Sequence, residues 1–183
     1  MNKLCFLIGT PHCGKSTLGR RVSEIMHLPF YDTDDMVRAK IGEVRIGDIF
    51  NSYIHSRSRS IEREVILKLS STLSNPAIIA TGAEVALIPD CVEAMRNTGY
   101  IIHIKRKLDS ILDDLRGSVD SRPVLVEVND GTILDFRERA VLTYADELPL
   151  YEALTELTIN NNGSEDDGVK LLLTLVQAIV VDQ

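Results

Sequence analysis

The chain has 183 residues, of which 44% are hydrophobic and 26% charged, and its formal net charge is −7. This composition is typical of one globular domain with a substantial core and excludes a disordered chain. The negative charge argues against nucleic acid as a partner, because neutralising phosphates needs clustered Lys and Arg. No segment approaches the roughly 20 apolar residues of a membrane span. Three cysteines, far apart in sequence, indicate reduced thiols and a cytoplasmic protein.

The first feature along the chain is a strand–loop–helix unit. An apolar run at 4–8 predicts a strand buried on both faces, and a helical pattern covers 17–28. Between them lies a G-x-x-x-x-G-K-S motif, made of Gly9, Thr10, Pro11, His12, Cys13, Gly14, Lys15 and Ser16 and followed by Thr17. The amides of such a loop bind a polyphosphate, Lys15 reaches the β- and γ-phosphates, and the Ser16 hydroxyl ligates Mg²⁺. We therefore predict that the chain binds a nucleoside triphosphate.

A second predicted strand, at 29–31, leads into an acidic loop with Asp32 and Asp34. In an open parallel sheet, ligands bind outside the carboxyl ends of the strands, which places this loop beside the phosphate loop. One carboxylate can hold the hydration shell of Mg²⁺, and the other can orient or deprotonate an acceptor hydroxyl. The alternative is structural, with Asp34 or Thr33 capping the next helix.

The middle of the chain adds one basic and one glycine position to the candidate site. Arg59 starts a long predicted helix at 56–74, and Gly82 follows a third strand at 77–80. A cation at a helix start suits an anionic substrate group, although surface pairing with Glu62 or Glu64 is an equal alternative. The other predicted elements are helices at 36–40, from about 46, at 84–98 with a break near 89, at 108–115, at 132–147 and at 165–181, and strands at 100–104 and 157–159.

A polar, turn-rich segment at about 112–130 predicts a mobile lid. It contains Arg116 and Arg122. A lid arginine near the γ-phosphate stabilises charge on the transferring group, and lid closure excludes water. The alternative is two exposed arginines on an ordinary loop.

Short apolar strands alternate with helices along the whole chain, which indicates an α/β protein. We expect a P-loop kinase-like three-layer fold, with a five-stranded parallel sheet, helices on both faces and a mobile lid. The prediction is one domain over 1–183, in which about 33–75 form a substrate-binding helical region.

Four segments together resemble the shikimate kinase family of small P-loop phosphotransferases. They are G-T-P-H-C-G-K-S-T-L-G-R at 9–20, F-Y-D-T-D at 30–34, R-S-I-E at 59–62 and R-P-V-L at 122–125. Their order and spacing match the family over nearly the whole chain, up to a turn at Pro149-Leu150-Tyr151 and the last strand.

The resemblance implies a reaction and a set of roles. The family transfers the γ-phosphoryl group of ATP to the 3-hydroxyl of shikimate, with Mg²⁺, in aromatic amino acid biosynthesis. Asp34 would bind the substrate hydroxyls and act as base, and Asp32 would support Mg²⁺. Arg59 would bind the shikimate carboxylate, Arg122 would contact the phosphates as a catalytic group with Lys15, and Arg116 would stack on adenine. Gly82 would lie against the substrate.

Three positions depart from the family pattern. Glu84 stands where the family has a glycine, Glu147 stands where it has an arginine that binds the substrate carboxylate, and His12 replaces a loop glycine. Loss of an arginine contact removes about 1.5–3 kcal/mol of charged hydrogen bonding. Either Arg57 or Arg139 compensates, or a neutral or cationic hydroxylated acceptor suits the site better.

The expected function is Mg²⁺-dependent transfer of the ATP γ-phosphoryl group to a hydroxyl of shikimate or a related small metabolite, by a cytoplasmic monomer. The expected partners are ATP and ADP and a small hydroxyl acceptor, without nucleic acid or membrane. The alternatives are another small-metabolite kinase, of gluconate or nucleotide type, and a non-catalytic ATP-binding paralogue.

Overall fold

A computed structural model describes residues 4–41, 52–118, 126–127, 133–134, 136–155 and 157–181 of the chain. Five strands form one sheet in the order β2-β3-β1-β4-β7, and every neighbouring pair is parallel. The predicted five-stranded parallel sheet is therefore confirmed. The strands are β1 (Leu4–Ile8), β2 (Phe30–Asp32), β3 (Ala77–Ala80), β4 (Gly99–Lys105) and β7 (Thr158–Asn160).

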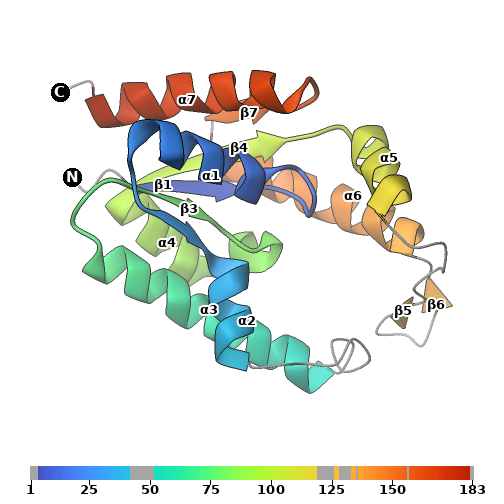
Figure 1. The fold of residues 1–183 in the computed structure, drawn as a ribbon. Coiled ribbons are helices and arrows are strands. Elements are labelled where there is room, and N and C mark those ends of the chain that lie inside the picture. Colours follow the sequence, from blue (N-terminus) through green and yellow to red (C-terminus); the bar gives the residue numbers. More distant parts are fainter. Residues whose placement is uncertain are drawn as a thin grey trace.

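Helices cover both faces of this sheet and complete the three layers (Figure 1). α1 and α7 pack together on one face, and α3 and α4 pack together on the other. The helices are α1 (Lys15–Met26), α2 (Thr33–Ile41), α3 (Ser52–Thr72), α4 (Pro89–Thr98), α5 (Leu108–Ser118), α6 (Phe136–Leu154) and α7 (Glu165–Val181), with a 3₁₀ helix, η2, at Ala83–Leu87.

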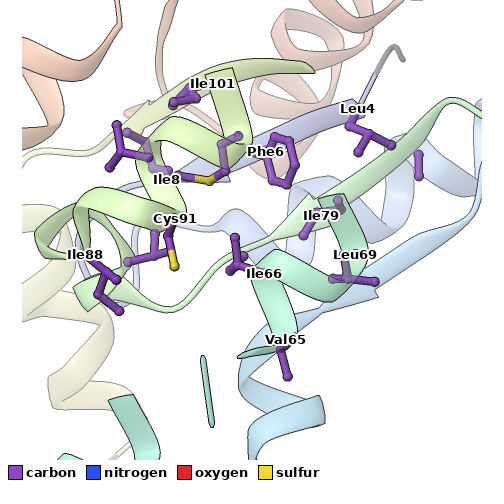
Figure 2. Packing of buried hydrophobic residues seen from close by; sticks show 14 of the residues in the cluster. Leu4, Phe6, Ile8, Val65, Ile66, Leu69, Ile79, Ile88, Cys91 and Ile101 are labelled. Carbon is purple, nitrogen blue, oxygen red and sulfur yellow. The ribbon is translucent and has the colours of Figure 1, made fainter. Parts of the chain in front are cut away.

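The central strand β1 divides the core into two halves. All five of its residues are fully buried, and successive side chains of a strand point to opposite faces. Leu4, Phe6 and Ile8 pack against α3 and α4 (Figure 2), whereas Cys5 and Leu7 pack on the side of α1 and α7. The continuous apolar run at 4–8 is therefore the signature of a strand that is covered on both sides.

The structure confirms one local prediction and corrects another. The break predicted near residue 89 in the helix at 84–98 is confirmed, because η2 ends before Ile88 and α4 begins at Pro89, where a missing N–H costs nothing. The turn predicted at 149–151 is wrong, because Pro149 lies inside α6. The helix continues past this proline because Tyr151 is fully buried and donates a hydrogen bond to Ala83 O, 2.7 Å away.

A short antiparallel pair, β5 (Val126–Glu127) with β6 (Ile133–Leu134), was not predicted. It displaces the start of the helix predicted at 132–147, which begins at Phe136 and reaches Leu154. Of the predicted lid, 112–118 belong to α5. Arg122 and the helix predicted from about residue 46 lie outside the described residues.

None of the helices within the described ranges is long and apolar enough to cross a membrane.

The core predicts a large stability loss on truncation of Phe6. Phe6→Ala removes a fully buried ring from the centre of the sheet, and we expect the free energy of unfolding to fall by about 3–5 kcal/mol. Urea unfolding of the two proteins measures the difference. Ile25→Ala is the matched control, because Ile25 is 51% exposed on α1. A loss at Phe6 no larger than that at Ile25 would contradict the packing.

Candidate active site

The phosphate loop joins β1 to α1 with a backbone that only certain residues can adopt. Gly9 has φ +146° and a Cβ at this position would lie 2.8 Å from Cys13 Sγ, so a glycine is required. His12 has φ +62°, in the left-handed region that disfavours side chains but in which His is enriched. This is the position at which the family resemblance implied glycine, and the structure explains why glycine suits it.

Lys15 is the centre of the loop. Its ammonium group donates to Gly9 O at 2.7 Å and to Thr10 O at 3.1 Å, and the side chain is buried. Ser16 is exposed in the first turn of α1, where the backbone N–H groups have no helical partners. The structure therefore brings the predicted nucleotide-binding residues 9–17 together at one helix N-terminus, which favours an anion.

Two supports of the loop were not found from the sequence. Asn161, buried at the end of β7, donates from Nδ2 to Cys13 O at 2.9 Å. Arg106, at the end of β4, donates to His12 O at 3.2 Å. The sequence signals these supports only by a polar residue at or directly after the end of a strand. Both residues lie more than 90 positions along the chain from the loop residues that they contact.

The acidic loop after β2 combines a structural and a site function. Asp34 N donates to Asp32 Oδ1 at 3.0 Å, so Asp32 caps α2. The capping alternative named Asp34 or Thr33, and both are wrong, since the cap is the preceding aspartate. Thr33 is buried, and its Oγ1 accepts a hydrogen bond from Gly82 N at 2.9 Å. This bond ties the carboxyl ends of β2 and β3 together.

Asp34 lies beside the phosphate loop. Desolvation by the surrounding groups raises its pKa above the usual range, although the side chain stays accessible to solvent. The Lys15 ammonium group opposes this rise, and Asp32 adds to it. A carboxylate with a raised pKa, next to the lysine of a phosphate loop, is suited to accept a proton from an alcohol.

Gly82 allows two carboxylates to come together. A Cβ at position 82 would overlap Glu62 Oε1 and lie 2.9 Å from Asp34 Oδ1. Glu62 is 7% exposed, and its Oε1 has no hydrogen-bond partner. Desolvation, followed by the charges of Asp34 and Glu84, raises the pKa of Glu62 to about 7. In the sequence, Glu62 belongs to the R-S-I-E segment and was also considered as a surface partner of Arg59, and its burial corrects the second interpretation.

Glu147, on α6, is a further acidic residue of the site. Its Oε2 lies 2.8 Å from the Tyr151 hydroxyl, which also donates to Ala83 O. Desolvation raises the pKa of Glu147, while the hydrogen bond from Tyr151 and the charge of Lys15 lower it. Glu84 adds to the rise, so the two departures from the family pattern lie close enough to repel each other.

The candidate basic residues are placed unevenly. Arg59 donates from Nη2 to Leu87 O at 3.0 Å, which holds it at the end of η2. The predicted surface pairing with Glu62 or Glu64 is therefore wrong, and Glu64 pairs with Lys40 instead. Arg57 is exposed. The backbone of Arg116 lies in α5, and the side chains of Arg116 and Arg139 are outside the described part.

All three cysteines are buried free thiols. Burial raises the pKa of Cys5 and Cys91 to about 12, as expected of packed thiols. Cys13 is fully buried within the phosphate loop and belongs to the core on the side of α1.

Comparison with known proteins decides the family. A family model described as "Shikimate kinase" matches residues 11–179. The chain belongs to the shikimate kinase family. It is therefore a shikimate kinase-like ATP-dependent phosphotransferase, in agreement with the resemblance seen in the sequence.

Relatives and solved structures match most or all of the chain. A shikimate kinase of Francisella tularensis subsp. novicida is 29% identical over 99% of this chain and 96% of its own. One from Bartonella henselae is 30% identical over 88% of this chain and 71% of its own. The structure of a shikimate kinase from Acinetobacter baumannii in complex with shikimate has a TM-score of 0.76 at 22% identity, covering 100% of this chain and 96% of that one. A gluconokinase from Sinorhizobium meliloti, at 0.61 and 10% identity over 98% and 94% of the two chains, shares the fold alone.

The buried Glu62 predicts a pH-dependent stability. Its pKa is about 7 in the folded protein and ordinary in the unfolded chain, so the folded state keeps the proton longer. Protonation of Glu62 therefore stabilises the folded state, and this contribution to the free energy of unfolding is complete below about pH 4.5. It is lost as the pH rises through 7, in total about 3 kcal/mol. Urea unfolding without ligands, from pH 5 to pH 8, should show Glu62→Gln gaining stability relative to the parent protein as the pH rises. Glu64→Gln is the exposed control, and a Glu62→Gln difference that stays constant with pH would refute the prediction.

Proposed function

We propose that this enzyme transfers the γ-phosphoryl group of ATP to a hydroxyl of shikimate or a related small ring metabolite. The observation that carries the proposal is the placement of Asp34 near Lys15, at the carboxyl ends of β2 and β1, which both pair with β3. The nucleotide-binding loop and a carboxylate with a raised pKa thus share one edge of the sheet. The relatives named shikimate kinase support shikimate as the first acceptor to test.

In the proposed step, the acceptor hydroxyl loses its proton to Asp34 as its oxygen bonds to the γ-phosphorus, and the bond to the β-phosphate oxygen breaks. ADP leaves with the electrons of that bond. Lys15 supplies positive charge to the transferring group, and the loop amides hold the remaining phosphate oxygens. Most of the catalysis comes from positioning and electrostatic stabilisation rather than from covalent chemistry.

The residues at the helix start fit a magnesium ion. Mg²⁺ takes few protein ligands and keeps several waters. The exposed Ser16 hydroxyl offers one oxygen donor, and Asp32 uses Oδ1 to cap α2, which leaves Oδ2 for a metal-bound water. The ion would neutralise charge on the phosphates, and Ser16 and Asp32 would hold it there.

The remaining roles follow from the family. We propose that Arg59, held next to η2, contacts the acceptor together with Gly82, and that Arg122 reaches the phosphates from a lid at about 112–130. Arg116 would pack on adenine. We also propose that the enzyme is a monomer and works in the cytoplasm, where ATP is supplied.

Asp34→Asn tests the proposal directly. The variant keeps the shape of the side chain but cannot accept the proton, so we expect acceptor-dependent ADP release to fall by about 10²–10⁴-fold. ATP binding, measured by calorimetry, should stay nearly unchanged. Asp35→Asn is the matched control, because Asp35 is the next residue of α2, is exposed, and pairs with Arg38 at 2.7 Å. Full activity of Asp34→Asn would remove Asp34 from the reaction.

A further inference from the structure

Four carboxylates lie near the proposed acceptor position, Asp34, Glu62, Glu84 and Glu147, and the charge of Glu84 acts on both Glu62 and Glu147. We call them the acidic cluster. They come from α2, α3, η2 and α6, so the tertiary fold alone brings them together. The space that a Cβ at Gly82 would occupy borders both Asp34 and Glu62. The Tyr151 hydroxyl lies within hydrogen-bond distance of both Ala83 O, in η2, and Glu147 Oε2.

Glu62 points to a ligand because one of its carboxylate oxygens, Oε1, is buried without a hydrogen-bond partner. The side chain is more than nine-tenths buried, Oε1 accepts no hydrogen bond, and this oxygen lies over Gly82 next to Asp34. A buried carboxylate without a partner costs far more than a paired one. A ligand with a hydrogen-bond donor at this position would satisfy Oε1.

Glu147 is oriented but not neutralised. Its Oε2 meets the Tyr151 hydroxyl, and within the described part of the chain neither Glu147 nor Glu62 has an ion-pair partner within 4.0 Å. The Tyr151 hydroxyl has one proton and two acceptors, Ala83 O and Glu147. At least one Glu147 oxygen therefore remains available to a donor.

Two cations near the cluster, in the described part of the chain, donate to backbone carbonyls. The Lys15 ammonium group donates to two loop carbonyls, and Arg59 donates to Leu87 O. An anionic acceptor would add a negative charge to these carboxylates and to the nucleotide phosphates. Each additional pair of like charges is unfavourable there, because a partly buried site screens charges less than bulk water does. An ammonium group reverses the sign of this interaction.

We infer that the preferred acceptor of this enzyme is a small polyhydroxylated amine whose ammonium group binds Glu62 and Glu147 while one hydroxyl faces Asp34. The inference rests on the proposed function, because the hydroxyl is phosphorylated by the same step. The O–P bond forms at that hydroxyl, its proton passes to Asp34, and ADP leaves. The ammonium group is bound and unchanged.

Three six-membered ring compounds of different charge test the inference. Shikimate is an acid, myo-inositol is neutral and 2-deoxystreptamine is a diamine. ADP release is measured with each at pH 7.5 with saturating Mg-ATP, and ³¹P NMR identifies the phosphate ester and separates transfer from ATP hydrolysis. We expect kcat/KM for 2-deoxystreptamine to exceed that for shikimate by about tenfold or more, with myo-inositol between them.

Variants of Glu147 then test whether its charge determines the preference for the amine over the acid. Glu147→Gln keeps an acceptor for Tyr151 but loses the charge, and should lower kcat/KM for the amine by about tenfold without changing the KM for ATP. Glu147→Arg should shift the preference toward shikimate. Glu24→Gln, at an exposed position near the far end of α1, is the control for net charge and should change neither preference. Thermal unfolding of each variant confirms folding, and Glu147→Gln alone suffices if Glu147→Arg does not fold.

The outcomes distinguish failure of the cationic acceptor from failure of the proposed phosphoryl transfer. Saturable phosphorylation of shikimate with a higher kcat/KM than the amine overturns the cationic acceptor and leaves the proposed phosphoryl transfer intact. Equal loss with acid and amine in Glu147→Gln also overturns it, because the effect would not depend on charge. Binding of ATP without phosphate ester formation from any of the three compounds would overturn both proposals.

Discussion

The Lys15 ammonium group is the electrostatic centre on which the whole site depends. It is buried under the loop and bonded to Gly9 O and Thr10 O. It also lowers the pKa values of Asp34, Glu62 and Glu147, which come from three different helices. One positive charge therefore serves both halves of the site. It attracts the phosphates on one side and partly compensates the carboxylates on the other.

Close backbone approach at the ends of β2 and β3 makes this arrangement possible. The Thr33 hydroxyl accepts from Gly82 N, and the absence of a side chain at Gly82 leaves room for Glu62 Oε1. Asp32 fixes the start of α2, so Asp34 leaves the sheet at a defined angle. The apolar core below, with β1 fully buried, holds the strands in register. Stability and site geometry thus depend on the same few contacts.

Predictions from the sequence succeeded where one pattern dominates. The apolar runs at 4–8 and 77–80 are buried strands, and the pattern at 165–181 is the helix α7. Predictions failed where distant contacts override a local signal. Pro149 normally ends a helix, but the burial of Tyr151 and its bond to Ala83 carry α6 beyond it. Asn161 and Arg106 were missed because their partners lie on the loop more than 90 residues away.

The sequence by itself determined the fold class, the nucleotide-binding loop and the family, because each depends on short runs of residues and on their order along the chain. The motif at 9–16 needs only a strand before it and a helix after it. The tertiary structure decided the electrostatics of the acceptor side. In the sequence, nothing marks Glu62 as a buried residue of its helix, and only tertiary packing buries it beside Gly82. Burial and charge proximity are properties of the folded arrangement, and no local pattern of residues contains them.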